Sequence, residues 1–263
     1  MMLGMEAICD DTAAEHEVLD QLVAPLSDAD WNLPTPADGW SIRDQISHLW
    51  FFDQRALQAL TDPEQFEADK ALLLSGGRGT DASVDPGRAI TPAELLAHWR
   101  RDRVALLSAA RPVDPSARVP WYGPAMGARS FITARLMETW AHGQDVADAL
   151  GAARPATDRL RHIAHIGVRA RPFSYAVRGM PVPPGDVHVR LLGPNGDEWI
   201  WNDPSSTDVV SGDALEFCLV VTQRRHLDDT HLNVVGDHAA TWMSIAQAFA
   251  GPPGAGRAPR HAP

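Results

Sequence analysis

Three side chains of metal-ligand type offer the clearest chemistry in this chain: His48, Glu138 and His142. Glu138 and His142 are four positions apart, so in a helix they share one face with Cβ atoms about 5–6 Å apart, a workable distance for chelation. One carboxylate and two imidazoles suit a borderline divalent ion such as zinc. Three protein ligands leave one coordination position open for water or substrate, which favours chemistry over a purely structural site.

The surrounding sequence decides between a metal site and more ordinary interpretations. On spacing alone, Glu138 and His142 are more often a surface pair or a satisfied core histidine. Their predicted helix, however, carries small and apolar residues along the same stripe: Phe131, Ala134, Ala141 and Ala149. A buried charge needs a partner or a metal. His48 also lies among apolar residues. Asp145, one turn after His142, is either an acceptor that orients a ligand histidine or a surface aspartate.

The elements that must position these residues are four predicted helices with a helical apolar period. Their approximate ranges are 5–26, 41–60, 91–110 and 130–150. Capping-box patterns mark the starts at Ser41 and Thr91, and Gly151 marks the end of the last helix. The segment 61–89 is rich in Pro, Gly and Asp and is expected to be a long connection. Four helices with one long crossover describe a bundle, and bundle interiors commonly hold metal sites between facing helices.

The carboxy-terminal part of the chain is expected to contain both strands and helices, unlike the helical first part. Residues 156–184 are predicted to form a helix and a Pro-rich linker, and residues 185–250 a small α/β domain. Within that domain the pattern predicts strands near 187–191 and 199–201 joined by a turn, a helix over 212–225, a strand over 232–235 and a helix over 239–249. The segment 251–263 is mostly Pro, Gly and Ala and is expected to be disordered. The predicted fold class is therefore α+β, with a helical bundle over 1–155 preceding the small domain.

Composition limits the partners and the compartment. Lys and Arg total 23 against 34 Asp and Glu, a formal net charge of −11. The positive residues are dispersed, whereas nucleic-acid binding needs concentrated positive charge, so nucleic acid is not an expected partner. No stretch approaches the roughly 18 apolar residues of a membrane span, and the amino terminus does not resemble a signal peptide. Cys9 and Cys218 are too few for a disulfide framework, which favours the cytoplasm. The oligomeric state is left open.

Two parts of the sequence resemble a known family. GWSIRD (residues 39–44), which leads into SHL (47–49), and METWAHGQD (137–145) are similar to the mycothiol-dependent maleylpyruvate isomerase family within the DinB/YfiT-like metalloprotein superfamily. The resemblance implies a DinB-like four-helix bundle, His48, Glu138 and His142 as metal ligands, and mycothiol as the thiol cofactor. It also implies that an arginine of the carboxy-terminal domain helps to bind thiol or substrate carboxylates. Arg224 and Arg225 are the nearest candidates for this catalytic role, although adjacent arginines near a helix end are often a solvated cap.

Together these inferences predict a metal-dependent enzyme that activates mycothiol for isomerisation of, or transfer to, a small electrophilic substrate such as maleylpyruvate. Metal coordination lowers the pKa of a thiol enough to deprotonate it near neutral pH. Two alternatives stay open. One is a non-catalytic DinB-like protein in which the ion only joins two helices. The other is a small-molecule binding module whose pocket is formed by aromatic residues that would otherwise be core packing: Trp121, Tyr122, Trp199 and Trp201.

Overall fold

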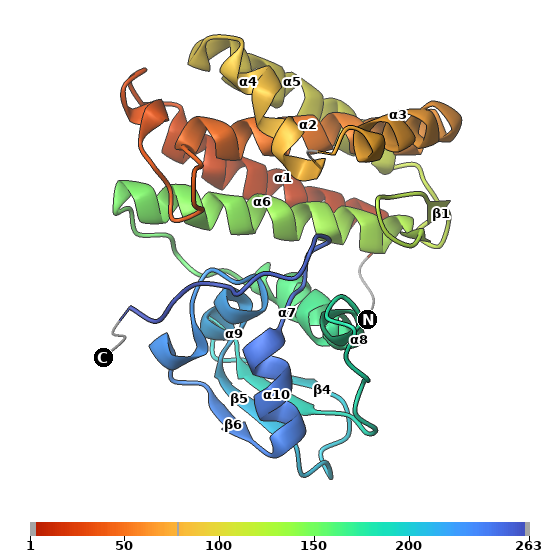
Figure 1. Ribbon diagram of the computed structural model, residues 1–263, viewed down its shortest axis with the longest axis vertical. Helices are drawn as coiled ribbons and strands as arrows, with labels where there is room; N and C mark the ends of the chain where they lie inside the picture. Colours follow the sequence, from red (N-terminus) through yellow and green to blue (C-terminus); the bar gives the residue numbers. More distant parts are fainter. Residues whose placement is uncertain (1–3, 78, 261–263) are drawn as a thin grey trace. The chain divides into compact units, whose positions relative to one another are not determined.

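The computed structural model describes residues 4–77 and 79–260 and divides the chain into two compact units, Met1–Arg154 and Pro155–Pro263. The first unit is helical, and the second combines a sheet with short helices (Figure 1). The predicted fold class, a helical bundle followed by a small α/β part, is confirmed. None of the helices in the described part of the chain combines the length and apolar character needed to cross a bilayer.

The first unit is built around four long helices of the described chain: α1 (Met5–Val23), α2 (Ile42–Thr61), α5 (Pro92–Ala110) and α6 (Ala128–Leu150). Helix α2 packs against α5 and α6, and α1 packs against the same two helices, so α1 and α2 are diagonal partners in the bundle. Buried apolar side chains from these helices form its core, among them Leu19, Ile46, Leu49, Leu95, Trp99 and Val146. The shorter elements of this unit include the 3-10 helix η1 (Asp30–Asn32) and the antiparallel strands β1 (Arg118–Val119) and β2 (Met126–Gly127).

Local sequence sets where the bundle helices begin and end. The Ser41 hydroxyl accepts a hydrogen bond from the backbone N–H of Asp44, whose carboxylate accepts from the backbone N–H of Ser41 at 2.9 Å. Thr91 forms the equivalent capping box at the start of α5. Gly151 ends α6 with a φ of 61°, in the left-handed region. These caps confirm the predicted boundaries, and by fixing the start of α2 they fix the face on which His48 lies.

The segment 61–89 is largely helical, so the prediction of a long connection is wrong. It forms α3 (Pro63–Ser75), the 3-10 helix η2 (Gly79–Val84) and α4 (Asp85–Arg88). The prolines that suggested a connection occupy the first turns of α3 and α4, where a missing N–H is tolerated. The Asp62 carboxylate caps α3 by accepting from the backbone N–H of Gln65 at 3.2 Å, and Phe66 buries its whole side chain. Arg78, in the Gly-rich run, lies outside the described residues.

The second unit contains a mixed four-stranded sheet in the order β4-β3-β5-β6, within its described residues. Strand β3 (His188–Leu192) pairs antiparallel with β4 (Glu198–Trp201) and parallel with β5 (Val209–Asp213), and β5 pairs antiparallel with β6 (Asn233–Val235). The helices of this unit are α7 (Leu160–Arg169), α8 (Arg171–Ala176), α9 (Ala214–Val221) and α10 (Asp237–Ile245), with the 3-10 helix η3 (Leu227–Asp229). Strands β3, β4 and β6 and helices α9 and α10 lie close to their predicted positions.

Two details of this unit differ from the sequence-based expectation. Strand β5 occupies residues where a helix was expected to begin, and Asp213 is both its last residue and the N-cap of α9. No turn residues separate the two elements, so the sequence contains no signal that a strand ends and a helix begins here. The segment 156–184 contains α7 and α8, which divide at Ala170, just before Pro172. The single helix expected here is thus two short helices, of which α7 packs against α9 within the second unit, and the Pro-rich linker that follows stays a prediction.

The segment after α10 takes part in several hydrogen bonds within the second unit. Gln247 Nε2 donates to the carbonyl oxygens of Gly251 and Pro252 at 3.2 and 3.4 Å. The backbone N–H of Arg260 donates to the Asp229 carboxylate at 3.0 Å. These hydrogen bonds involve residues 251, 252 and 260, and the disorder expected over 251–263 stays a prediction. Residues 261–263 lie outside the described residues.

Candidate metal centre

The bundle brings the three ligand-type residues together. His48 lies in the second turn of α2, while Glu138 and His142 are one turn apart on α6, the helix that packs against α2. One potential ligand atom from each of the three lies within 4.8 Å of those of the other two. Among the described residues, no other group of three His, Cys, Asp or Glu side chains is gathered this closely. The geometry needed for chelation is therefore present.

The cluster is partly shielded from water by aromatic rings. His48 and His142 are 7% and 8% exposed, and their ring centroids are 4.4 Å apart. Trp40 stacks on His142 at 5.9 Å with an interplanar angle of 16°, and Phe52 lies 4.7 Å from the ring of His48. The Glu138 carboxylate, 20% exposed, is 3.2 Å from His142 Nε2. The aromatic rings thus cover the two histidines, while the Glu138 carboxylate is the more exposed member of the cluster.

Each histidine uses Nδ1 for a contact with a neutral polar side chain. His48 Nδ1 lies 2.9 Å from the hydroxyl of Ser83, and His142 Nδ1 lies 2.5 Å from Gln45 Oε1. Metal-binding histidines commonly use one ring nitrogen in this way, which fixes the ring and leaves the other nitrogen for the ion. Sequence reasoning considered Asp145 for this orienting role and missed Gln45 and Ser83. Gln45 precedes His48 by one helical turn and therefore lies on the same side of α2, but this spacing alone does not indicate its contact with His142.

Ser83 is held beside His48 by a contact between α2 and the segment before α4. Ser47 Oγ donates to the carbonyl oxygen of Ser83 at 2.8 Å and accepts from the backbone N–H of Gly87 at 3.0 Å. A Cβ atom at position 87 would come within 2.4 Å of Ser47 Cβ, so only glycine permits this approach. The segment that was predicted to be a long connection therefore supplies a contact to a candidate ligand.

A second buried polar cluster contacts all four bundle helices. Arg135 of α6 and Asp53 of α2 are 3% and 0% exposed and form an ion pair at 2.9 Å. Trp99 Nε1 of α5 donates to the same carboxylate at 3.2 Å, and His16 Nε2 of α1 lies 4.0 Å from it. Burial, more than any other influence, raises the pKa of Asp53, while Arg135 opposes the rise. Burial likewise lowers the pKa of His16 to about 3. Hydrogen bonds to Asp53 therefore join α2, α5 and α6, and His16 of α1 packs edge-on against the Trp99 ring.

The predicted arginines, Arg224 and Arg225, lie in the second unit beyond the end of α9. Arg224 Nη1 donates to the carbonyl oxygen of Thr222 at 2.7 Å, and Arg225 Nη1 donates to that of Arg224 at 2.7 Å. Their catalytic role stays a prediction.

The aromatic residues of the alternative binding module belong to two local clusters. Trp121 stacks on Phe66 and contacts Tyr122 in the first unit. Trp199 is buried in β4 of the second unit, and Trp201 Nε1 lies 3.2 Å from His165 Nδ1. Within each unit, these contacts support the packing interpretation.

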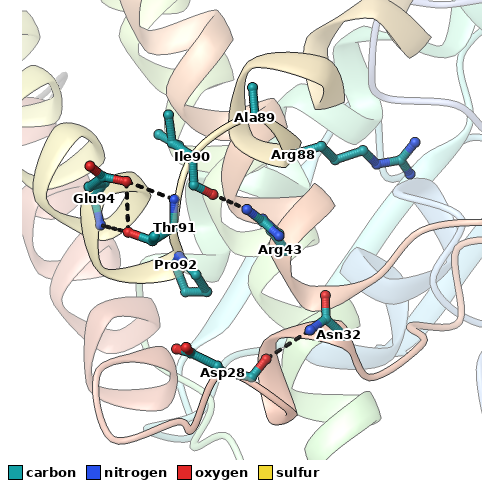
Figure 2. Close-up of a pocket in the computed structure, with 9 residues that line it drawn as sticks. All are labelled: Asp28, Asn32, Arg43, Arg88, Ala89, Ile90, Thr91, Pro92 and Glu94. Atoms are coloured by element: carbon teal, nitrogen blue, oxygen red, sulfur yellow. Dashed lines mark hydrogen bonds between the residues drawn. The ribbon is translucent and has the colours of Figure 1, made fainter.

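A pocket of about 440 Å³ opens beside the start of α5. Figure 2 shows Arg43 directed at the backbone carbonyl oxygen of Ile90, next to the capping box of Thr91 and Glu94. None of the three candidate ligands lines this pocket. Its other arginine, Arg88, forms a two-point contact with the Asp44 carboxylate at 2.7 and 2.9 Å. Arg88 is thus paired with a carboxylate of the fold, whereas Arg43 donates to backbone carbonyl oxygens.

Comparison with known proteins adds a family and a set of relatives. The sequence profile described as the mycothiol maleylpyruvate isomerase N-terminal domain matches residues 12–147, which include all three candidate ligands. Uncharacterized proteins from two strains of Mycobacterium tuberculosis are each 48% identical over 248 residues, covering 94% of this chain and 96% of the relative. The crystal structure of a mycothiol-dependent maleylpyruvate isomerase has a TM-score of 0.58 at 16% identity, covering 84% of this chain and 90% of that one. A mutant of that enzyme gives a TM-score of 0.57. At this identity the likeness to the solved structures supports the fold.

Proposed function

This chain belongs to the mycothiol maleylpyruvate isomerase family, and from that membership we propose that it is a metal-dependent enzyme that activates a low-molecular-weight thiol. The metal would be a divalent ion such as zinc, held by His48, Glu138 and His142. The thiol would be mycothiol, and the reaction isomerisation of, or transfer to, a small electrophilic substrate such as maleylpyruvate. The observation that carries the proposal is the convergence of the three ligand-type side chains within 4.8 Å.

The donor set fits a divalent ion. Two imidazole nitrogens and one carboxylate oxygen are ligands that zinc accepts, and three protein ligands match the number found in catalytic zinc sites. The Nδ1 contacts to Ser83 and Gln45 match the supporting hydrogen bonds expected around metal-binding histidines. A bound divalent ion would lower the pKa of a coordinated thiol and make it a nucleophile near neutral pH. Trp40 and Phe52 would limit the access of water to the candidate ligands.

The thiols of the chain itself are poor candidates for the nucleophile. Cys9 and Cys218 are both fully buried. Burial raises the pKa of Cys9 to about 11 and raises that of Cys218 well above its usual range. A thiolate is the reactive form, and these residues stay protonated near neutral pH. This favours a thiol supplied from solution, as the proposal requires.

Cobalt substitution tests the proposal. The purified full-length protein is loaded with Co²⁺, and its visible absorption is recorded with and without mycothiol or a simple thiol analogue. The expected result is a new sulfur-to-metal charge-transfer band on thiol addition, with no such band in His142→Ala. Turnover of maleylpyruvate and other cis enedioic acids is then measured with the zinc-loaded protein.

The alternatives predict different outcomes. If cobalt binds stoichiometrically and the spectrum ignores thiols, the ion only joins α2 and α6, and the enzymatic proposal fails. If His48→Ala and His142→Ala retain the full metal content of the wild type, the ligand assignment fails. His162→Ala, which changes an α7 histidine outside the candidate ligand set, is the matched control and should keep both the metal and the thiol band.

A further inference from the structure

We propose that Gln45 is a positioning residue that keeps the ring proton of His142 on Nδ1, and that Thr35, in the loop before α2, orients Gln45 for this purpose. The effect is to leave His142 Nε2 unprotonated and directed at the candidate metal position. The inference deepens the proposed function, because it rests on His142 as a ligand, but the position of the ring proton is measurable without any metal or thiol.

The direction of each hydrogen bond in this chain of contacts follows from the groups involved. The Thr35 hydroxyl donates its only proton to the backbone carbonyl of Trp40 at 2.9 Å, so towards Gln45 its oxygen is an acceptor. Gln45 Nε2 donates to that oxygen at 2.8 Å. The amide is thereby oriented with Oε1 facing His142 Nδ1 at 2.5 Å. Because a carbonyl oxygen only accepts, Nδ1 must carry the proton.

Backbone contacts fix the conformation of the loop that carries Thr35. Pro34 and Ser41 form an antiparallel bridge, and the backbone N–H of Thr35 donates to the carbonyl oxygen of Trp40 at 2.8 Å. Gly39, with a φ of 72°, makes the reversal possible. Trp40 is thus the acceptor that fixes the Thr35 hydroxyl and also the ring that stacks on His142. The same short loop therefore supports His142 in two ways, through the Thr35 contact to Gln45 and through the Trp40 ring.

Burial makes the Gln45 amide difficult to reorient. The side chain is fully buried on α2, in the turn that also carries the core residues Ile42 and Ile46. Its two polar ends are paired with Thr35 and His142. Turning the amide over would place Gln45 Oε1 against the Thr35 oxygen, whose only proton is donated to Trp40, and an unsatisfied buried polar group costs about 1–3 kcal/mol. The observed orientation is therefore strongly preferred.

Glu138 is the reason that this positioning matters. Its carboxylate lies 3.2 Å from His142 Nε2, within reach of a proton on that nitrogen. Without Gln45, the favoured arrangement is Nε2–H donating to Glu138, which occupies the nitrogen and the carboxylate oxygen that a metal would use. With Gln45 holding the proton on Nδ1, the two acceptors face one another and favour a cation between them.

The test is made on the metal-free, full-length protein. Ring ¹⁵N chemical shifts of His142 are measured by long-range ¹H–¹⁵N correlation at mildly alkaline pH, where an imidazole is neutral. His142→Ala identifies the signals. The wild type is expected to show a protonated, pyrrole-like Nδ1 and an unprotonated, pyridine-like Nε2. In Gln45→Met the pattern is expected to reverse, and in Gln45→Glu, which keeps an acceptor at this position, it is expected to persist.

Metal affinity gives an independent readout through competition with a chromophoric chelator. Gln45→Met is expected to bind Zn²⁺ roughly 10–100-fold more weakly than the wild type, the range typical when a hydrogen bond that supports a metal-binding histidine is lost. Gln45→Glu should remain close to the wild type. Thr35→Val removes the acceptor of the Gln45 amide together with the hydroxyl that donates to the Trp40 carbonyl oxygen, and should fall between these two variants. Because Thr35 is half-buried, this variant tests the idea even if Gln45→Met folds poorly.

The matched control is Gln54→Met, the same substitution on the same helix. Gln54 Nε2 donates to Asp102 on α5, so this variant removes a glutamine hydrogen bond that does not reach His142. It should change neither the ring shifts nor the metal affinity. A proton on Nε2 in the wild type would overturn the proposal, as would unchanged ring shifts and zinc affinity in Gln45→Met. An absence of any thiol effect on the cobalt spectrum would instead refute the proposed function and leave the ring-proton result standing.

Discussion

Replacing Arg135 with methionine is expected to leave a carboxylate in the bundle interior without its cation. Asp53 is fully buried, and Arg135 Nε and Nη2 both donate to its Oδ1, at 3.1 and 2.9 Å. Trp99 Nε1 donates to the other carboxylate oxygen at 3.2 Å. Methionine retains an unbranched stem and removes the charge and the donors, so the substitution tests the ion pair more than the packing.

The expected magnitude follows from burial. Removing one partner of a buried ion pair costs about 3–5 kcal/mol, because the remaining charge keeps its desolvation penalty. Removing an exposed pair changes stability by about 0–1 kcal/mol. Arg101 supplies the matched control, since its side chain is 61% exposed and pairs with Asp102 at 2.6 Å. Arg135→Met should therefore lower the free energy of unfolding several times more than Arg101→Met does.

The pH dependence gives a second signature. Burial raises the pKa of Asp53 above that of the unfolded chain, and Arg135 opposes this rise. A carboxyl group with a raised folded-state pKa stabilises the protein below its unfolded pKa and loses that contribution as pH rises through the folded pKa. Without Arg135 the folded pKa of Asp53 rises further. The variant should therefore be closest to the wild type in acid and furthest from it near neutral pH.

Urea unfolding followed by circular dichroism, at mildly acidic and neutral pH, measures these differences. The double variant Asp53→Asn/Arg135→Met removes the unpaired charge while keeping an acceptor for Trp99, and it should recover part of the lost stability. Equal losses in Arg135→Met and Arg101→Met, or no recovery in the double variant, would refute the argument.

Two further substitutions test other parts of the bundle. Burial lowers the pKa of His16 to about 3, so this residue contributes stability above its unfolded pKa of about 6.5, and the contribution is lost as pH falls towards 3. His16→Leu should flatten that part of the curve of unfolding free energy against pH, and an unchanged slope would contradict the assignment. Gly87→Ala places a Cβ within 2.4 Å of Ser47 Cβ and should lower the free energy of unfolding by about 1–3 kcal/mol and shift the ring ¹⁵N signals of His48. Gly76→Ala, whose Cβ would meet nothing closer than 3.4 Å, is the control, and equal effects of the two substitutions would contradict the proposed role of Gly87.

The bundle was predictable because its signals are local. Capping boxes at Ser41 and Thr91 and the left-handed end at Gly151 depend on residues within one turn, and the apolar period shows which faces meet. The candidate ligands were predictable in the same way, from the i, i+4 pair of Glu138 and His142 and an apolar setting around His48.

The supporting contacts were harder to predict because they depend on tertiary packing. Gln45 is a polar residue at a core position, and an apolar period gives no indication of what its amide contacts. Ser83 comes from a segment whose prolines suggested a connection but occupy the first turns of helices. Strand β5 runs directly into α9 through Asp213, so no turn residue marks the change of conformation.

The separation of the candidate ligands along the chain has a consequence for the order of folding. His48 lies on α2, and Glu138 and His142 lie on α6, with α3, α4 and α5 between them. Closing so long a loop is entropically unfavourable until the intervening helices have packed, so the complete site forms only when α6 docks against α2. A metal ion would therefore bind after the bundle has assembled and would stabilise the folded bundle, and it would not nucleate folding. The rate at which the refolding chain gains tight metal binding would then measure the rate at which the first unit completes its folding.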